Sequence, residues 1–240
     1  MQLSDSVALV GSGDARLTNQ YDCNVYAIDA PDSTVLVDTG AGLSPSAILD
    51  RAESVFGSVT HALLTHAHAD HSQGAPALQD RGVEVCACNA TADLVSSGTE
   101  AELGVDVARS EGIYPEKYSF ENFHVDRSFA VDTELDLAGL SVNPVLLRGH
   151  APDHVVYLVE LDGEMICFVG DAVYPDGSIS LLNVPGSSLT DYRTDIDGLI
   201  GRGINALLPG HGLPIMADGQ AAIDDAAEAL TRMSTPPSKT

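Results

Sequence analysis

The chain has little positive charge, few aromatic side chains and no tryptophan. Its 240 residues include 11 lysines and arginines against 35 aspartates and glutamates, which gives a formal net charge of −24. Such an acidic surface repels nucleic acid phosphates and anionic lipid headgroups, so neither nucleic acid nor a membrane is an expected partner. A hydrophobic content of 44% nevertheless excludes an acidic disordered chain, because disorder goes with low hydrophobicity.

The sequence also lacks long apolar runs and a basic leader. No run approaches the roughly 18 apolar residues of a membrane-spanning helix, and residues 1–5 lack the basic head of a signal peptide. The four cysteines, Cys23, Cys86, Cys88 and Cys167, form no Cys-x-x-Cys pair and lie in apolar segments. Buried free thiols are typical of a reducing compartment, so the sequence predicts a soluble cytoplasmic protein.

The acidic residues are spread along the chain, and only two lysines, Lys117 and Lys239, occur. This composition favours an origin in a salt-accumulating halophile. At molar salt the Debye length falls to about 3 Å, so repulsion between carboxylates is screened while the surface stays hydrated. An unusually acidic enzyme from a low-salt organism is the alternative.

Apolar runs bounded by turn residues predict one α/β domain over residues 1–232 and a flexible tail at 233–240. In the first half we expect strands at 7–10, 23–28, 34–37, 61–65 and 83–87, and helices at 44–57, 75–80 and 91–95. In the second half we expect strands at 132–137, 140–146, 155–159, 165–169 and 206–208, and helices at 189–200 and 220–232. The alternation of strands and helices in the first half indicates a layered α/β fold.

Residues 90–128 interrupt this alternation. The stretch is polar, yet it contains four of the twelve tyrosines and phenylalanines in the chain: Tyr114, Tyr118, Phe120 and Phe123. One interpretation is an aromatic lid over a substrate pocket. The other is a small helical insertion whose rings pack onto the sheet, and the sequence favours neither.

The stretch THAHADH at residues 65–71 follows a short apolar run that predicts the end of a buried strand. His66 and His68 are two residues apart, so in extended backbone their side chains leave on the same side. Asp70 and His71 follow where the chain must turn. Imidazole and carboxylate donors at this density predict one or two divalent metal ions, zinc or iron by ligand type.

Further aspartates and histidines lie where other apolar strands reach a glycine corner. Asp38 lies in VDTG, His150 in GHAPDH, Asp171 in VGD and His211 in PGHG. If these strand ends meet along one sheet edge, they form a polar site on a rigid scaffold.

This ordered set of residues resembles the metallo-β-lactamase superfamily, and the resemblance covers almost the whole chain. It implies a four-layer αββα sandwich with two divalent metal ions at one edge of the two sheets. Zinc is the first expectation for these ions, and iron or manganese are alternatives. The implied ligands are His66, His68 and His150 for the first metal, Asp70, His71 and His211 for the second, and Asp171 as a bridge between them.

The resemblance is to the glyoxalase II-like hydrolase branch, and it implies hydrolysis of a thioester or lactone by a hydroxide shared between the metals. Two metals about 3.5–4 Å apart would lower the pKa of a shared water so that it ionises to hydroxide near neutral pH, and they would polarise a carbonyl. Asp70 would orient the hydroxide or carry a proton. Residues 212–240 are too few for the basic C-terminal part with which a glyoxalase II binds glutathione. A glutathione thioester is therefore less favoured as the substrate, and a smaller acyl-thioester is the alternative.

Three more residues resemble supporting groups of the family. Asp38 resembles a carboxylate that holds a ligand or the following turn, with a plain turn aspartate as the alternative. His154 lies four residues after His150, as in glyoxalase II-like members, and is interpreted as structural or as support for a ligand. Tyr174 lies three residues after Asp171, which resembles the tyrosine of acyl-homoserine lactonases that binds the substrate carbonyl. A tyrosine that only packs is equally compatible.

Two other activities fit parts of the pattern. Residues 65–71 also resemble persulfide dioxygenases, in which one iron would be held by His66, His150 and Asp171, but that activity leaves His211 without a role. A β-lactamase is less favoured, because Asp171 stands where cysteine or histidine is typical. A small molecule is the expected partner, and the sequence leaves the oligomeric state open, a homodimer included.

Overall fold

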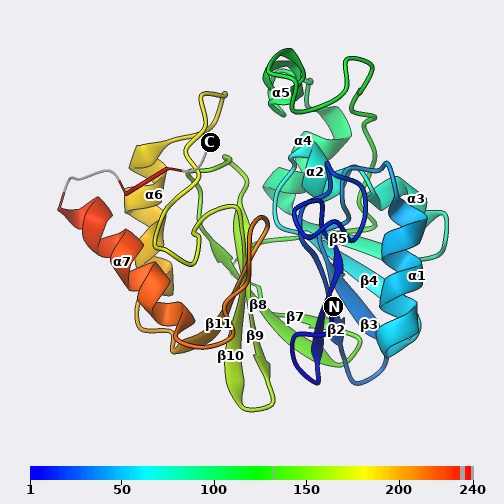
Figure 1. The fold of residues 1–240 in the computed structure, drawn as a ribbon, viewed down its shortest axis with the longest axis horizontal. Helices are drawn as coiled ribbons and strands as arrows, with labels where there is room; N and C mark the ends of the chain where they lie inside the picture. The colour runs from blue at the N-terminus through cyan, green and yellow to red at the C-terminus, as the bar shows by residue number, and fades with distance from the viewer. Residues whose placement is uncertain (132, 233–235, 239–240) are drawn as a thin grey trace.

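The computed structural model describes residues 1–131, 133–232 and 236–238, and its strands form two sheets packed face to face (Figure 1). The first sheet has the order β1 (Val7–Gly11), β2 (Val25–Asp29), β3 (Thr34–Val37), β4 (Val59–Leu64), β5 (Glu84–Cys88) and β6 (Arg127–Phe129). The second has the order β11 (Ile204–Pro209), β10 (Glu164–Gly170), β9 (Val155–Leu161), β8 (Leu140–Leu146) and β7 (Leu135–Leu137). The αββα sandwich predicted from the sequence is confirmed.

Helices cover the outer face of each sheet (Figure 1). Those beside the first sheet are α1 (Pro45–Phe56), α3 (Ala75–Gln79) and α4 (Asn89–Ser97). Those beside the second are α6 (Leu189–Asp195), the 3-10 turn η1 (Ile196–Leu199) and α7 (Gly219–Thr231). None of the helices in the described ranges has the length and apolar character that crossing a bilayer requires.

Alternating side chains on each strand form three apolar layers. On β3, Val35 and Val37 face the layer between the sheets, whereas Leu36 faces the layer beneath α1. On β10, Phe168 lies between the sheets and Cys167 faces the layer beneath α7. Strands that are buried on both faces read as continuous apolar runs, which is why the runs in the sequence predicted them well.

Some predicted elements differ from the structure. The helix expected over residues 189–200 is divided into α6 and η1, because Gly198 weakens helical propensity at its end. Three short elements were not predicted: α2 (Ala69–Ser72), α5 (Val105–Ser110) and β6. Residue 132, the predicted start of a strand, and residues 233–235 and 239–240 of the predicted tail lie outside the described residues. Residues 236–238 lie beside residue 179, where the Ile179 amide donates to the Pro237 carbonyl at 3.0 Å.

Two buried tyrosines tie the sheets together at one edge. The Tyr26 hydroxyl on β2 donates to the carbonyl of Pro209, the last residue of β11, at 2.7 Å. The Tyr157 hydroxyl on β9 donates to the carbonyl of Leu64, the last residue of β4, at 2.5 Å. Each sheet therefore fixes a strand end of the other, and both of these strand ends lead directly into candidate metal ligands.

The stretch from residue 90 to residue 128 contains most of α4, all of α5 and the start of β6. Its four aromatic rings are buried in the apolar layer outside the first sheet: Tyr114, Tyr118, Phe120 and Phe123. This position agrees with the packing interpretation of the rings. A role as a substrate lid stays a prediction.

Candidate metal centre

The candidate ligands follow the ends of four strands that meet at one edge of the sandwich. Residues 65–71 follow β4 and enter the one-turn helix α2, which turns Asp70 and His71 back toward the strand end. His150 follows β8, Asp171 follows β10 and His211 follows β11. Short segments after regular strands place all seven predicted ligands at this edge.

His66, His68 and His150 form one group, the trihistidine cluster. The Nδ1 atom of His68 lies 3.0 Å from Nε2 of His66 and 2.9 Å from Nε2 of His150. The other ring nitrogens of the outer two histidines have partners, since Nδ1 of His66 lies 3.0 Å from Thr65 Oγ1 and Nδ1 of His150 lies 3.3 Å from the Ser180 carbonyl. Such contacts fix which nitrogen of an imidazole faces a metal.

Burial keeps the trihistidine cluster neutral. Removal from water, together with the neighbouring imidazoles, lowers the pKa of His66 well below its usual value. Burial and the facing ring of His150 lower the pKa of His68 to about 3. Three uncharged imidazoles with convergent nitrogens are the form in which histidine binds a metal.

Asp70, His71 and His211 form a second group, the mixed cluster. Oδ2 of Asp70 lies 3.0 Å from Nε2 of His211 and 3.6 Å from Nε2 of His71. Burial alone would lower the pKa of His211, but the carboxylates of Asp171, Asp14 and Asp70 outweigh it and raise the value to about 10. Without a metal, this cluster therefore balances its carboxylates with bound protons.

Asp171 lies between the two clusters. Its Oδ1 is 3.4 Å from Nε2 of His71, and its Oδ2 is 3.6 Å from Nε2 of both His150 and His211. Each cluster thus faces an oxygen of the same carboxylate.

The buried polar atoms at this edge fit divalent metal ions. Nε2 of His71 and Oδ1 of Asp171 are buried and 3.4 Å apart, yet neither has a hydrogen-bond partner among the described residues. Folded proteins avoid this condition unless another group satisfies the atoms. Gly210 leaves the space free, because a Cβ there would lie 2.2 Å from Asp171 Oδ1 and 2.6 Å from His71 Cε1. Imidazole nitrogens and carboxylate oxygens together suit zinc, iron or manganese.

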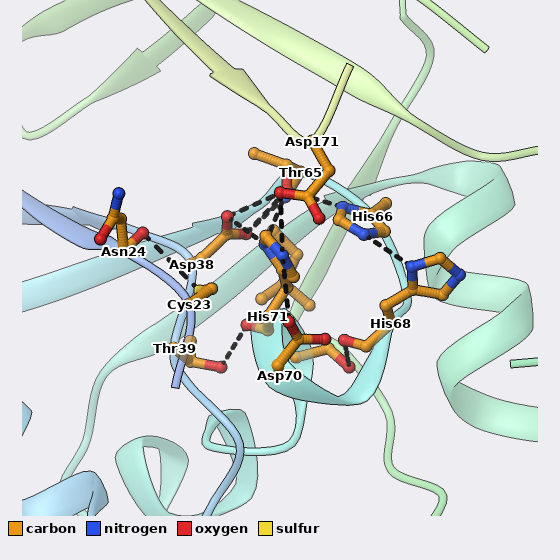
Figure 2. A network of polar contacts seen from close by, with 12 residues as sticks. Cys23, Asn24, Asp38, Thr39, Thr65, His66, His68, Asp70, His71 and Asp171 are labelled. Atoms are coloured by element: carbon orange, nitrogen blue, oxygen red, sulfur yellow. Dashed lines mark hydrogen bonds and ion pairs between the residues drawn. The ribbon is translucent and has the colours of Figure 1, made fainter. Parts of the chain in front are cut away.

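Asp38 supports the mixed cluster through contacts with His71 and Thr65 (Figure 2). Its Oδ2 lies 2.8 Å from Nδ1 of His71, and its Oδ1 accepts a hydrogen bond of 2.8 Å from the Thr65 amide. The Thr65 hydroxyl also donates to Oδ2 at 2.9 Å. The backbone of Asp38 is left-handed, with φ 63°, a conformation that aspartate tolerates better than most residues.

His154 and Tyr174 lie close behind the ligands. Nε2 of His154 accepts a hydrogen bond of 3.1 Å from the Asp171 amide, so this side chain contacts the backbone of a candidate ligand. Tyr174 is buried, and burial together with the Asp171 carboxylate raises its pKa. Its predicted contact with a substrate carbonyl stays a prediction.

Sequence reasoning did not predict three contacts with the site, although it named Tyr114 as a possible lid residue. The Tyr114 hydroxyl donates to Oδ1 of Asp70 at 3.0 Å. Asp14 accepts from the Gly212 amide at 2.8 Å, and its Oδ2 lies 3.7 Å from Nδ1 of His211. Asp153 accepts from the Ala67 amide at 2.8 Å. Only Asp153 lies inside a motif, GHAPDH, that could have drawn attention to it.

Residues 18–211 match the Metallo-beta-lactamase superfamily, and the chain belongs to this superfamily. It is 28% identical over 216 residues to the lactamase-like protein nscB of Neosartorya fischeri, covering 89% of this chain and 55% of that protein. It is 24% identical over 211 residues to the atrochrysone carboxyl ACP thioesterase dmxR1 of a Cryptosporiopsis species, covering 87% of this chain and 54% of that protein. The chain spans about half the length of these curated relatives.

A solved structure, the metallo-beta-lactamase from Pontibacter korlensis, has the same fold. It superimposes with a TM-score of 0.67 at 21% sequence identity, over 96% of this chain and 97% of that one. The family and the fold are therefore those that the strand-end residues predicted.

Proposed function

We propose that the chain is a binuclear metal-dependent hydrolase of ester-type bonds, with a thioester or a lactone as its small-molecule substrate. The observation that carries the proposal is the position of Asp171, whose two oxygens lie within 3.6 Å of nitrogens from both clusters. That position suits a carboxylate that bridges two ions. The similarity to a thioesterase supports a thioester in particular.

In this proposal the trihistidine cluster holds the first ion and the mixed cluster holds the second. When bound, a pair of divalent ions, zinc in the first place, would supply Lewis acidity and an activated water. Asp171 would offset part of the concentrated positive charge. Asp70, held at one oxygen by Tyr114, would offer its other oxygen to the second ion, and that oxygen would also orient a water or carry a proton. Tyr174 would bind the substrate carbonyl.

A mononuclear iron dioxygenase acting on persulfides is the competing proposal. It needs only His66, His150 and Asp171. The contact of 3.0 Å between His211 and Asp70 favours the two-ion site, because the dioxygenase leaves both residues without a function.

Metal content per chain, with the identity of each metal, tests the proposal together with a substrate panel. The expected result is two zinc ions, or a mixed pair, and hydrolysis of a thioester or lactone. The panel should include a β-lactam and a persulfide. One iron per chain with oxygen uptake on the persulfide would overturn the proposal, and turnover of the β-lactam alone would replace the substrate class.

We also propose that this hydrolase works in the cytoplasm of a halophile and resembles the glyoxalase II-like branch. The net charge of −24 supports the first part, because such a chain repels itself at low ionic strength. Urea unfolding in dilute and in molar potassium chloride tests it. The free energy of unfolding should rise with salt, and equal values would contradict the halophile proposal.

A further inference from the structure

We infer that Tyr114 is a positioning residue for the second metal, because its hydroxyl holds the Asp70 carboxylate in the orientation that turns the other oxygen toward His211. The inference rests on the proposed two-ion site. It gives the 90–128 segment a function other than that of a lid, namely support of the candidate metal ligand Asp70.

The two oxygens of Asp70 have different partners. Oδ1 accepts the Tyr114 hydroxyl at 3.0 Å, and Oδ2 lies 3.0 Å from Nε2 of His211. The outer torsion of an aspartate is broad, and its two-fold symmetry only exchanges equivalent oxygens, so the side chain alone does not fix the plane of the carboxylate. A donor at one oxygen restricts that plane and keeps the other oxygen turned toward His211.

Tyr114 is held firmly enough to act in this way. Its ring stacks on Tyr118, with centroids 4.4 Å apart and an angle of 24° between the planes. The Tyr118 hydroxyl donates to the Ala41 carbonyl at 2.9 Å, in the loop that follows Asp38. The ring of Tyr21 packs edge-on against Tyr114, with centroids 6.2 Å apart. The stacking of the two rings therefore places the Tyr114 hydroxyl, and this stacking does not need the hydroxyl of Tyr118.

The hydroxyl of Tyr114 acts as a donor at neutral pH. Its ring is 8% exposed, and burial next to Asp70 raises its pKa well above the usual value. Supporting contacts of this kind change metal affinity by about 10–100-fold in metalloproteins.

A cobalt titration of the metal-free 240-residue chain tests the inference without any substrate. Co²⁺ binding is followed by the visible absorption of each step in the wild type, Y114F and Y118F. Y118F is the matched control, because it deletes a hydroxyl from the same ring pair but one that contacts only a backbone carbonyl. Tyr114→Phe should weaken the second step by about 10-fold or more and alter the spectrum of the second ion. The first step should stay unchanged in both variants.

Each outcome decides the inference. Equal second-step affinity and spectrum in the wild type and Y114F would overturn it and leave the proposed hydrolase intact. Equal weakening in Y114F and Y118F would also overturn it, since packing of the rings would then be the cause. A wild type that binds a single cobalt ion would overturn the two-ion site and the inference with it. An unchanged first step reports that Y114F is folded.

Discussion

The trihistidine cluster and the mixed cluster contain similar donor atoms, but their histidines differ in protonation. His66 and His150 are buried, and the imidazoles of the trihistidine cluster have lowered pKa values, so the cluster is neutral before any metal arrives. In the mixed cluster the His211 side chain is 34% exposed, and carboxylates raise its pKa. The first cluster is therefore a preformed metal site, whereas the second must exchange protons for a metal.

The two clusters also differ in what supports them. The trihistidine cluster is supported by groups within or next to its own motifs, such as Thr65 and Asp153. The mixed cluster is supported by Asp38 in the VDTG motif and also by side chains from distant loops, namely Asp14 and Tyr114. Substitutions away from the motifs should therefore change the second metal far more than the first.

Loss of a trihistidine nitrogen should have the largest effect. His68→Ala removes the atom that faces both other histidines, so the first ion should be lost. We expect kcat/KM on the best substrate to fall by about 1,000-fold, or about 4 kcal/mol, while circular dichroism stays unchanged. The control is His61→Ala on β4, where the polar contacts of the ring among the described residues are with Thr60 and Glu84. Full activity in His68→Ala would remove the first metal from the proposed reaction.

Substitution of Asp38 should act on the mixed cluster and on stability. Asp38→Asn keeps a residue that tolerates the left-handed backbone but takes the charged partner from His71. We expect second-ion affinity to fall by about 10–100-fold and the free energy of unfolding to fall by about 1–3 kcal/mol. Metal titration and urea unfolding measure the two effects. An equal loss at the first step would show that Asp38 supports the whole edge and not one cluster.

The next largest effect is expected from pH, because the affinities of the two clusters for metal should depend on pH differently. A histidine must lose its proton before it binds a metal, and the pKa of His211 is raised to about 10. Between pH 6 and 10 the second-ion affinity should therefore rise with pH, by up to about tenfold per unit for each proton released. First-ion affinity should stay flat above pH 5, since the pKa of His68 is about 3. Zinc titrations with proton-release measurements test this, and parallel slopes would contradict it.

In the metal-free chain, protonation of His211 should also change the free energy of unfolding. Because the pKa of His211 is higher in the folded chain than when unfolded, its contribution is fully present below about pH 6.5. The contribution is lost as pH rises through about 10. Urea unfolding of the metal-free chain across this range should therefore give lower stability at the alkaline end.

The smallest effect is expected at Asp14. Its side chain is 55% exposed and lies 3.7 Å from His211, and exposed pairs contribute about 1 kcal/mol or less. Asp14→Asn, which keeps an acceptor for the Gly212 amide, should weaken the second ion by less than about fivefold. Isothermal titration at low salt would measure this change. A loss as large as that from Asp38→Asn would mean that the 12–22 loop is a main support of the site.

Much of the site was readable in the sequence because its donors lie directly after apolar strands. The runs before His66, Asp171 and His211 are buried on both faces, so their ends were marked by composition alone. The contacts of Tyr114 and Asp14 were not readable, because they depend on the path of loops with no periodic pattern. The turn of α2 was missed for a similar reason, since a four-residue helix has too few residues for a helical period.

The hydrogen bonds of Tyr26 and Tyr157 between the two sheets affect whether the chain can be split into two halves that each bind metal. Within the described part of the chain, each hydroxyl donates to a carbonyl of the opposite sheet. A fragment that ends between β6 and β7 would leave one tyrosine hydroxyl and one strand-end carbonyl without their partners, at the position where the ligands must be aimed. The halves should therefore recover metal binding only when they are mixed and reassociate, and not as separate modules.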